Sequence, residues 1–192
     1  MGWCVSAESA ETARVGTYEV YNSQTGQTTT RTSTGIPNWF PGASKVQNVV
    51  IPLGMPVEQI VELIIAAKPE DEKFSKLRLG SHGVPGMLCL AGQGNMPLME
   101  GNAIELSPLR EHFNLLAEGG DNYGVILIHA CKVASDFKTA FGGSICGLAL
   151  LKKIAEVTNT PVQAPYQDQP MNATKFQGPT LYVYPNGNYA IC

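Results

Sequence analysis

Short apolar runs alternate with longer stretches of helical spacing along the chain from Lys45 onward. The apolar runs have the length of strands and predict strands at residues 46–53, 77–80, 87–90, 125–130 and 161–164, with a C-terminal hairpin at 180–192. Helical periodicity and helix-start signals predict helices at residues 56–68, 107–118 and 143–157. Strands and helices that alternate in this way form a mainly parallel sheet with helices on both faces, a three-layer α/β/α sandwich.

The first part of the chain has a different composition, rich in Thr, Ser and Gly. Two segments of β-branched and aromatic residues, 17–21 and 28–32, flank a Gly-containing turn and predict a hairpin. We therefore divide the chain into an N-terminal arm, residues 1–44, and one α/β domain, residues 45–192.

Charge and cysteine usage narrow the functional classes. Thirteen basic and sixteen acidic residues give a net charge of −3 without clustering, so a nucleic-acid partner is not indicated. No apolar stretch reaches the roughly 18 residues of a membrane span. The cysteines at 4, 89, 131, 146 and 192 include no C-x-x-C pair, and the three histidines lack metal-ligand spacing. These features predict a reducing, cytoplasmic compartment and neither a metal nor a cofactor.

Two blocks of the chain end abruptly in reactive side chains. The first reads Lys-Leu-Arg-Leu-Gly-Ser-His-Gly and places His82 just after a predicted strand, while the second reads Gly-Val-Ile-Leu-Ile-His-Ala-Cys and places Cys131 after another. Because functional groups gather at the carboxyl ends of parallel strands, we expect the two side chains at one edge of the sheet. A thiolate is a nucleophile and an imidazole is its usual proton acceptor, so the pair predicts a catalytic dyad.

The two blocks, "LRLGSHG" and "VILIHAC", resemble the signature of the caspase-like (clan CD) cysteine peptidases. The resemblance extends over roughly residues 46–165 and is closest to bacterial domains of the CHAT and DUF4347 type. In caspases the His likewise lies about 50 residues upstream of the Cys. The chain departs from the caspase pentapeptide Q-A-C-[RQG]-G, since residues 129–133 read His-Ala-Cys-Lys-Val, which argues against a true caspase with aspartate specificity.

The resemblance implies a cysteine endopeptidase that cleaves a protein substrate or its own precursor. Cys131 would form an acyl-enzyme, and His82 would activate the thiol and protonate the leaving amine. The oxyanion hole would consist of the backbone N–H groups of Gly83 and Cys131. A small single domain of this kind also fits an effector or toxin delivered into a host cell. His129 lies two residues before Cys131 and is expected to be structural.

Relatives in the clan recognise the residue before the cut through a charged pocket. Asp136 and Asp168 are the candidate acidic residues for that pocket, each with the alternative of an ordinary solvated loop carboxylate. An acidic pocket predicts a preference for a basic or neutral residue over aspartate.

The N-terminus matches the myristoylation pattern M-G-x-x-x-[ST], with Gly2 as acceptor and Cys4 placed for a second acyl chain. Acylation at both positions would attach the protein to a membrane. The alternative is an ordinary start codon followed by a small residue.

Two other functions use the same fold. The first is a non-catalytic caspase-like binding domain, against which the intact His82, Gly83 and Cys131 argue. The second is a thiol acyltransferase that uses the same dyad.

Overall fold

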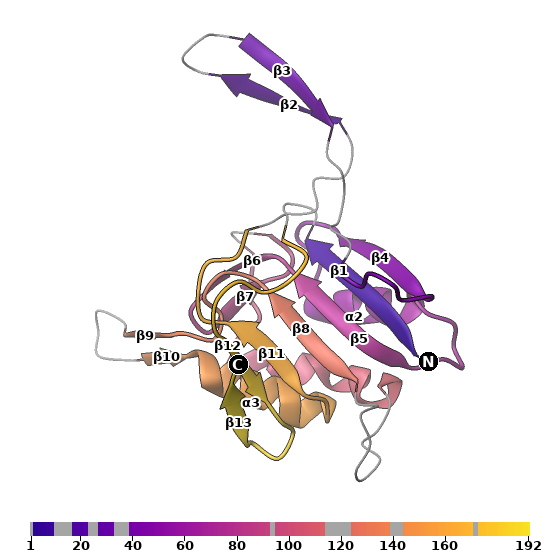
Figure 1. The fold of residues 1–192 in the computed structure, drawn as a ribbon, viewed down its shortest axis with the longest axis vertical. Helices are drawn as coiled ribbons and strands as arrows, with labels where there is room; N and C mark the ends of the chain where they lie inside the picture. Colours follow the sequence, from indigo (N-terminus) through magenta and orange to yellow (C-terminus); the bar gives the residue numbers. More distant parts are fainter. Residues whose placement is uncertain are drawn as a thin grey trace.

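A computed structural model describes residues 2–9, 17–22, 27–32, 39–92, 95–113, 124–138, 144–170 and 173–192. Its main feature is a seven-stranded sheet with the strand order β13-β12-β11-β8-β5-β1-β4 (Figure 1). Five neighbouring strands run parallel: β4 (Val46–Ile51), β1 (Trp3–Ser9), β5 (Phe74–Gly80), β8 (Val125–His129) and β11 (Val162–Pro165). The C-terminal hairpin of β12 (Thr180–Val183) and β13 (Tyr189–Ile191) extends the sheet antiparallel, as predicted. The fold is therefore mixed α/β with a mostly parallel sheet.

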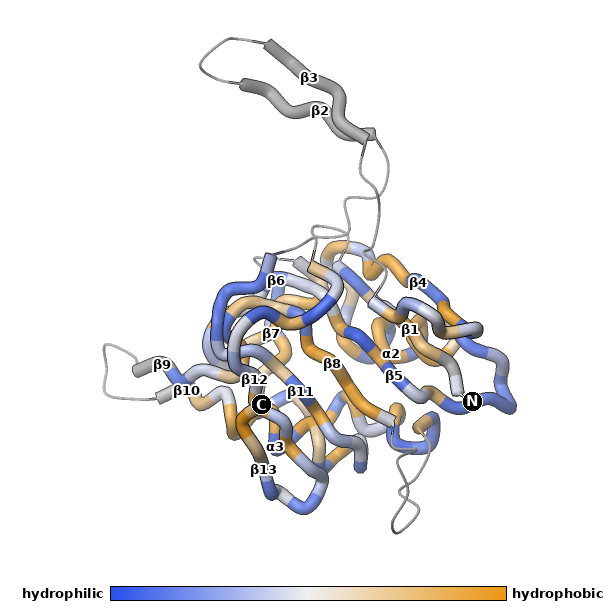
Figure 2. The backbone as a smooth tube through the Cα atoms, viewed as in Figure 1, coloured by the Kyte–Doolittle hydropathy of each residue, from blue (hydrophilic) through white to orange (hydrophobic). Residues whose placement is uncertain are grey.

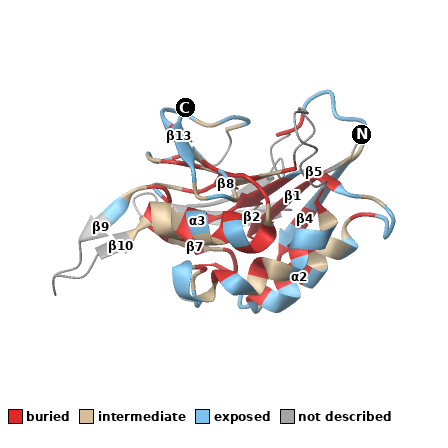
Figure 3. Ribbon diagram, turned by 90° about the horizontal axis from the view of Figure 1, so that it is seen from below, coloured by how far each residue is buried: buried red, intermediate tan, exposed pale blue. Residues whose placement is uncertain are grey.

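The described residues form three helices: α2 (Val57–Ala66), the 3-10 helix η1 (Glu100–His112) and α3 (Gly147–Thr158). They share one hydrophobic core with the sheet, and η1 packs against both α2 and α3. Figure 3 shows α2 and α3 on the same side of the sheet. In the described residues no helix covers the second face, so the predicted three-layer sandwich is not confirmed.

The order of the strands explains how the second face is covered. The connection from β1 to β4 moves outward in one direction, and the connections β4–β5, β5–β8 and β8–β11 move in the other. Because parallel crossovers are right-handed, the first connection is expected on the face opposite the helices. Trp39 and Phe40, which belong to that connection, pack there with Cys4 and Leu127. The reversal of direction puts a topological switch point between β1 and β5, where ligands bind in open parallel sheets.

Alternation along each strand separates an apolar face from a polar one. In β5, Leu77 and Leu79 join the core under the helices, while Arg78 points to the other face. Hydrophobic colour follows β8 and α2 in Figure 2, which together bury Ile126, Ile128 and the apolar face of the helix. No described helix is long and apolar enough to cross a bilayer.

The structure corrects the expected boundaries in three places. Residues 3–9, assigned to the arm, form β1, which lies between β5 and the edge strand β4. The helix expected to start at Ser107-Pro108 is instead η1, which begins at Glu100 and contains Pro108. Proline fits there because its fixed φ is also that of a 3-10 helix. The end of this helix, expected near residue 118, lies outside the described residues. The last helix begins at Gly147, because the preceding residues form a strand.

Three two-stranded sheets complete the described structure. The hairpin predicted in the arm is confirmed as β2 (Thr17–Asn22) and β3 (Gln27–Thr32). A second hairpin, β6 (His82–Val84) with β7 (Met87–Cys89), follows β5 directly. The third, β9 (Asp136–Lys138) with β10 (Ser144–Cys146), follows the turn that contains Cys131.

Candidate active site at the carboxyl edge of the sheet

His82 and Cys131 follow neighbouring parallel strands at matching positions. The ladder between β5 and β8 ends with Gly80 opposite His129, and the two candidate residues each lie two positions further on. The Ser81 N–H still donates to the His129 carbonyl at 3.3 Å, so the pairing continues to the residue before His82. The expectation that the two residues leave adjacent strands at one edge of the sheet is confirmed.

The turn that follows His82 is packed directly on the turn that contains Cys131. A Cβ atom at Gly83 would lie 2.6 Å from Cγ2 of Val133, 2.8 Å from Cβ of Ala130 and 2.9 Å from the Cys131 carbonyl oxygen. No side chain fits in that space, so a glycine is required for the two turns to meet. The Gly86 N–H donates to the Val133 carbonyl at 3.1 Å and fixes the hairpin in this position.

The hairpin pairing leaves the Gly83 amide outside the β6–β7 ladder. Gly83 lies opposite Leu88, whose N–H and carbonyl both pair with Leu98, at 2.9 Å and 2.8 Å. In an antiparallel ladder, opposed residues exchange either both hydrogen bonds or none. The Gly83 N–H therefore points away from β7.

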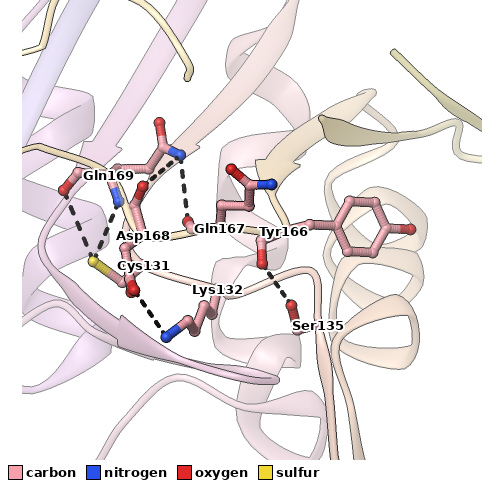
Figure 4. Close-up of polar contacts among 7 residues, drawn as sticks. All are labelled: Cys131, Lys132, Ser135, Tyr166, Gln167, Asp168 and Gln169. Carbon is pink, nitrogen blue, oxygen red and sulfur yellow. Dashed lines mark hydrogen bonds and ion pairs between the residues drawn. The ribbon is translucent and has the colours of Figure 1, made fainter. Parts of the chain in front are cut away.

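The Cys131 turn is held against the segment that follows β11. The Lys132 N–H donates to the Gln167 carbonyl at 3.1 Å, and the Ala134 N–H donates to the Pro165 carbonyl at 3.0 Å. The Ser135 hydroxyl donates to the Tyr166 carbonyl at 2.8 Å (Figure 4). Lys132 itself has a φ of 54°, in the left-handed region that residues other than glycine rarely occupy.

The Cys131 thiol is half-buried and contacts the backbone of Gln169. The Gln169 N–H donates to Sγ at 3.4 Å, and Sγ lies 3.8 Å from the Gln169 carbonyl oxygen (Figure 4). Next to the thiol, Lys132 Nζ and Asp168 Oδ2 form an exposed ion pair at 2.8 Å. The hydrogen bond to Lys132 lowers the pKa of Asp168, and the same bond raises the pKa of Lys132.

Both acidic pocket candidates have partners of their own. Asp168 is engaged by Lys132, as described above. Asp136 Oδ1 accepts the N–H of Gly147, the first residue of α3, at 3.1 Å. A carboxylate at this end of a helix stabilises it. The physical reason for an acidic pocket, a carboxylate left without a partner, is therefore absent at both positions.

A buried polar network on the second face of the sheet is the feature that the sequence did not reveal. Arg78 donates to Glu8 Oε2 at 2.7 Å, to Ser6 Oγ at 3.1 Å and to Nδ1 of His129 at 2.8 Å. Arg78 is 0% exposed and His129 is 4% exposed. Because a guanidinium only donates, His129 Nδ1 accepts and its proton lies on Nε2.

Burial and the neighbouring Arg78 charge together lower the pKa of His129 to about 3. An imidazole with such a pKa is a weak base at neutral pH, which supports the structural role expected for His129. The signal in the sequence was a polar alternation in β1, with Ser6 and Glu8 on one face.

Trp39 covers this network. Its ring centroid is 4.5 Å from that of His129 and 4.9 Å from the Arg78 guanidinium carbon, and Phe176 lies against it at 5.3 Å. Within the described residues, Trp39 Nε1, Arg78 Nε and His129 Nε2 are buried donors without a hydrogen-bond acceptor.

The lipidation candidates, Gly2 and Cys4, lie at the start of β1. The Cys4 side chain is only 6% exposed and its Sγ is 3.4 Å from the Ser75 hydroxyl. The Gly2 carbonyl accepts a hydrogen bond from the same hydroxyl at 3.1 Å. In this fold the Cys4 thiol is too deeply buried to accept an acyl chain.

Other binding features lie away from the dyad. Among the described residues, no group of three His, Cys, Asp or Glu side chains is placed to hold a metal ion. A cavity of about 320 Å³ opens between the start of α2 and the segment after β7, and its lining includes Pro56, Leu90 and Met96 but neither His82 nor Cys131.

Comparison of the chain with protein families, curated proteins and solved structures finds no match.

Proposed function

We propose that the protein is a caspase-like cysteine endopeptidase with Cys131 as nucleophile and His82 as its acid–base partner. The observation that carries the proposal is the register of β5 and β8, which takes His82 and Cys131 to matching positions beyond the ends of adjacent parallel strands. The close packing of Gly83 on the Cys131 turn supports it, because it holds the turn that follows His82 against the turn that contains Cys131.

The proposed reaction is acyl transfer through a thioester. His82 accepts the thiol proton, and the Cys131 thiolate attacks the carbonyl carbon of the scissile peptide bond. The negative charge that develops on the carbonyl oxygen is stabilised by the N–H groups of Gly83 and Cys131. The C–N bond then breaks as His82 gives its proton to the leaving amine. Water, deprotonated by His82, hydrolyses the thioester, releases the carboxylate product and restores the thiol.

The caspase-like architecture is part of the same proposal. The order of the five parallel strands supports it, since a switch point between β1 and β5 favours a ligand site at this edge. The three-layer form would need helices on the second face, which in the described residues is covered by Trp39, Phe40 and Phe176.

The specificity of the site remains a prediction. Preference for a basic or neutral residue over aspartate before the cut rested on unpaired carboxylates at Asp136 and Asp168, and both carboxylates are paired. A peptide library profiled with the purified protein tests this directly. A clear preference for aspartate would exclude an acidic pocket.

The test of the proposed function is cleavage of a proteome or of the protein itself. We expect new N-termini, identified by mass spectrometry, with the wild-type protein and none with Cys131→Ala. Cys89→Ala and Cys146→Ala are matched controls, because both cysteines are half-buried like Cys131, and these variants should retain cleavage. Truncating either is expected to cost roughly 1 kcal/mol of stability. Equal cleavage by Cys131→Ala, or equal loss in all three variants at equal folding, contradicts the assignment.

A further inference from the structure

The side chain of Gln169 forms hydrogen bonds with the backbone of its own loop. The loop connects β11 to β12, and Gln169 is 7% exposed within it. Its Nε2 donates to the Gln177 carbonyl at 2.9 Å, and its Oε1 accepts the Gln177 N–H at 2.9 Å. The same Nε2 lies 3.2 Å from the Asp168 carbonyl and 3.3 Å from that of Gln167. The side-chain amide thus pairs with the backbone on both sides of the loop.

These bonds fix the part of the loop that contacts the nucleophile. The backbone N–H of Gln169 donates to Cys131 Sγ at 3.4 Å (Figure 4). On the other side of the thiol, the Lys132 N–H is tied to the Gln167 carbonyl. The position of the Gln169 N–H relative to sulfur therefore depends on a loop conformation that the Gln169 side chain maintains.

We propose that Gln169 is a positioning residue for the nucleophile: its side chain holds its own backbone N–H on Cys131 Sγ and thereby stabilises the thiolate. A hydrogen bond donated to the charged form of an acid favours ionisation. The neutral thiol can instead donate to the Gln169 carbonyl, which lies 3.8 Å from sulfur. The two forms of the thiol thus use different backbone atoms of the same residue, and the shorter contact is the one that serves the thiolate.

The inference deepens the proposed function, since it concerns the same sulfur atom, but its test requires no peptide substrate. Only the thiolate reacts with iodoacetamide, so the alkylation rate of Cys131 reports the thiolate directly. Mass spectrometry of the peptide that contains Cys131 separates its reaction from that of the other four cysteines.

The decisive comparison is between Gln169→Met and Gln163→Met. Methionine keeps the length of the side chain and removes its hydrogen bonds without adding charge. Gln163 is the matched control, because it lies on β11, the strand that leads into the same loop, and its Nε2 donates a part-buried hydrogen bond to Thr180 Oγ1 on β12 at 2.8 Å. Thermal unfolding of both variants shows that they are folded and measures the general cost of losing a glutamine bond.

We expect Gln169→Met to slow alkylation of Cys131 near pH 7 by roughly tenfold or more, the equivalent of one hydrogen bond to a charged group. Its rate profile should move to higher pH and reach the wild-type rate when the thiol is fully ionised. Gln163→Met should leave the profile unchanged. If Gln169→Met does not fold, Gln169→Asn, which keeps an amide but shortens its reach, is expected to give the same shift.

An unchanged alkylation profile in a folded Gln169 variant would overturn the proposal and leave Gln169 as a loop anchor only. That outcome is distinct from failure of the proposed function. A shifted profile without any proteolysis by the wild-type protein would leave the role of Gln169 standing and remove the peptidase assignment.

Discussion

Among single residues, His129 should have the clearest effect on the pH dependence of stability. Burial, followed by the Arg78 charge, lowers the pKa of its imidazole to about 3 from an ordinary value of 6.5. Above pH 6.5 the imidazole is neutral in the folded and unfolded chain, and the full stability is present. Below that pH the unfolded chain binds a proton that the folded chain excludes, so stability falls by at most about 1.4 kcal/mol per pH unit until the folded pKa is reached.

The measurement is the free energy of unfolding in urea at pH 7 and pH 5, for the wild type and His129→Gln. We expect the wild type to lose up to about 2 kcal/mol more than the variant over this interval. His112→Gln is the control, because burial and the charges of Lys68 and Lys73 also lower the pKa of His112, which is less buried. It should reduce the pH dependence by less. Identical pH dependence in the wild type and His129→Gln would show that His129 takes up a proton equally well when folded.

Single residues of the site differ in whether their positions could be predicted from the sequence. Cys131 and His82 could be placed at one edge because each ends an apolar run, and strand ends in a parallel sheet coincide. The ion pair of Arg78 with Glu8 could not be predicted from the sequence, because the two residues are distant in the chain and charged residues are rarely buried. The hydrogen bond between Asp136 and the first residue of α3 could not be predicted either, because it depends on where that helix begins.

The turn after β8 is the element whose backbone carries strain. Lys132 has a φ of 54°, and both its N–H and its ammonium group bind the segment after β11. A β-branched side chain tolerates this conformation poorly, whereas glycine adopts it freely. We predict that Lys132→Val lowers the melting temperature by roughly 2–8 °C, and that Lys132→Gly leaves it within about 2 °C of the wild type.

Thermal unfolding monitored by circular dichroism checks this order. Lys175→Val is the control, because Lys175 is exposed and does not have a positive φ. It should change the melting temperature by less than Lys132→Val does. Equal effects of valine at both lysines would show that the left-handed conformation of Lys132 costs nothing.

Elements were predictable wherever the apolar periodicity was strong. The runs in β8 and α2 are buried along one face, and both elements lie where their patterns placed them. β1 was missed because it contributes only short side chains, Val5 and Ala7, to the described core under the helices, while Ser6 and Glu8 lie on its other face. η1 was misplaced because Ser-Pro is a common helix start, whereas here it lies inside a helix of 3-10 type.

At the scale of the whole molecule, the described end of the connection from β1 to β4 covers part of the sheet face that has no described helix. Right-handed crossover sends this connection over the polar side of the sheet. Trp39 and Phe40 then shield Cys4 and, through Trp39, the network of Arg78 and His129. Residues that composition assigned to an arm are therefore part of the folded domain, which the composition of a segment cannot show.

If Trp39 covers the second face of the sheet, its removal should lower the free energy of unfolding as much as the loss of a core aromatic side chain does. Trp39 is 8% exposed and packs on the rings of His129 and Phe176. We predict that Trp39→Ala lowers the free energy of unfolding in urea by about 3 kcal/mol or more, and Trp39→Phe by less, since a smaller ring still covers Arg78.

Met96→Ala is the matched control for this prediction, because it truncates a large apolar side chain that is 78% exposed. It should change the free energy of unfolding by less than about 0.5 kcal/mol. A similarly small effect of Trp39→Ala would mean that the β1–β4 connection lies only loosely on the sheet. Water could then reach the ion pair of Arg78 and Glu8 beneath Trp39. The folded domain would consist of β1 and the residues from β4 onward. A loss of stability near that of a core residue would instead show that Trp39 is packed as firmly as the core of the domain.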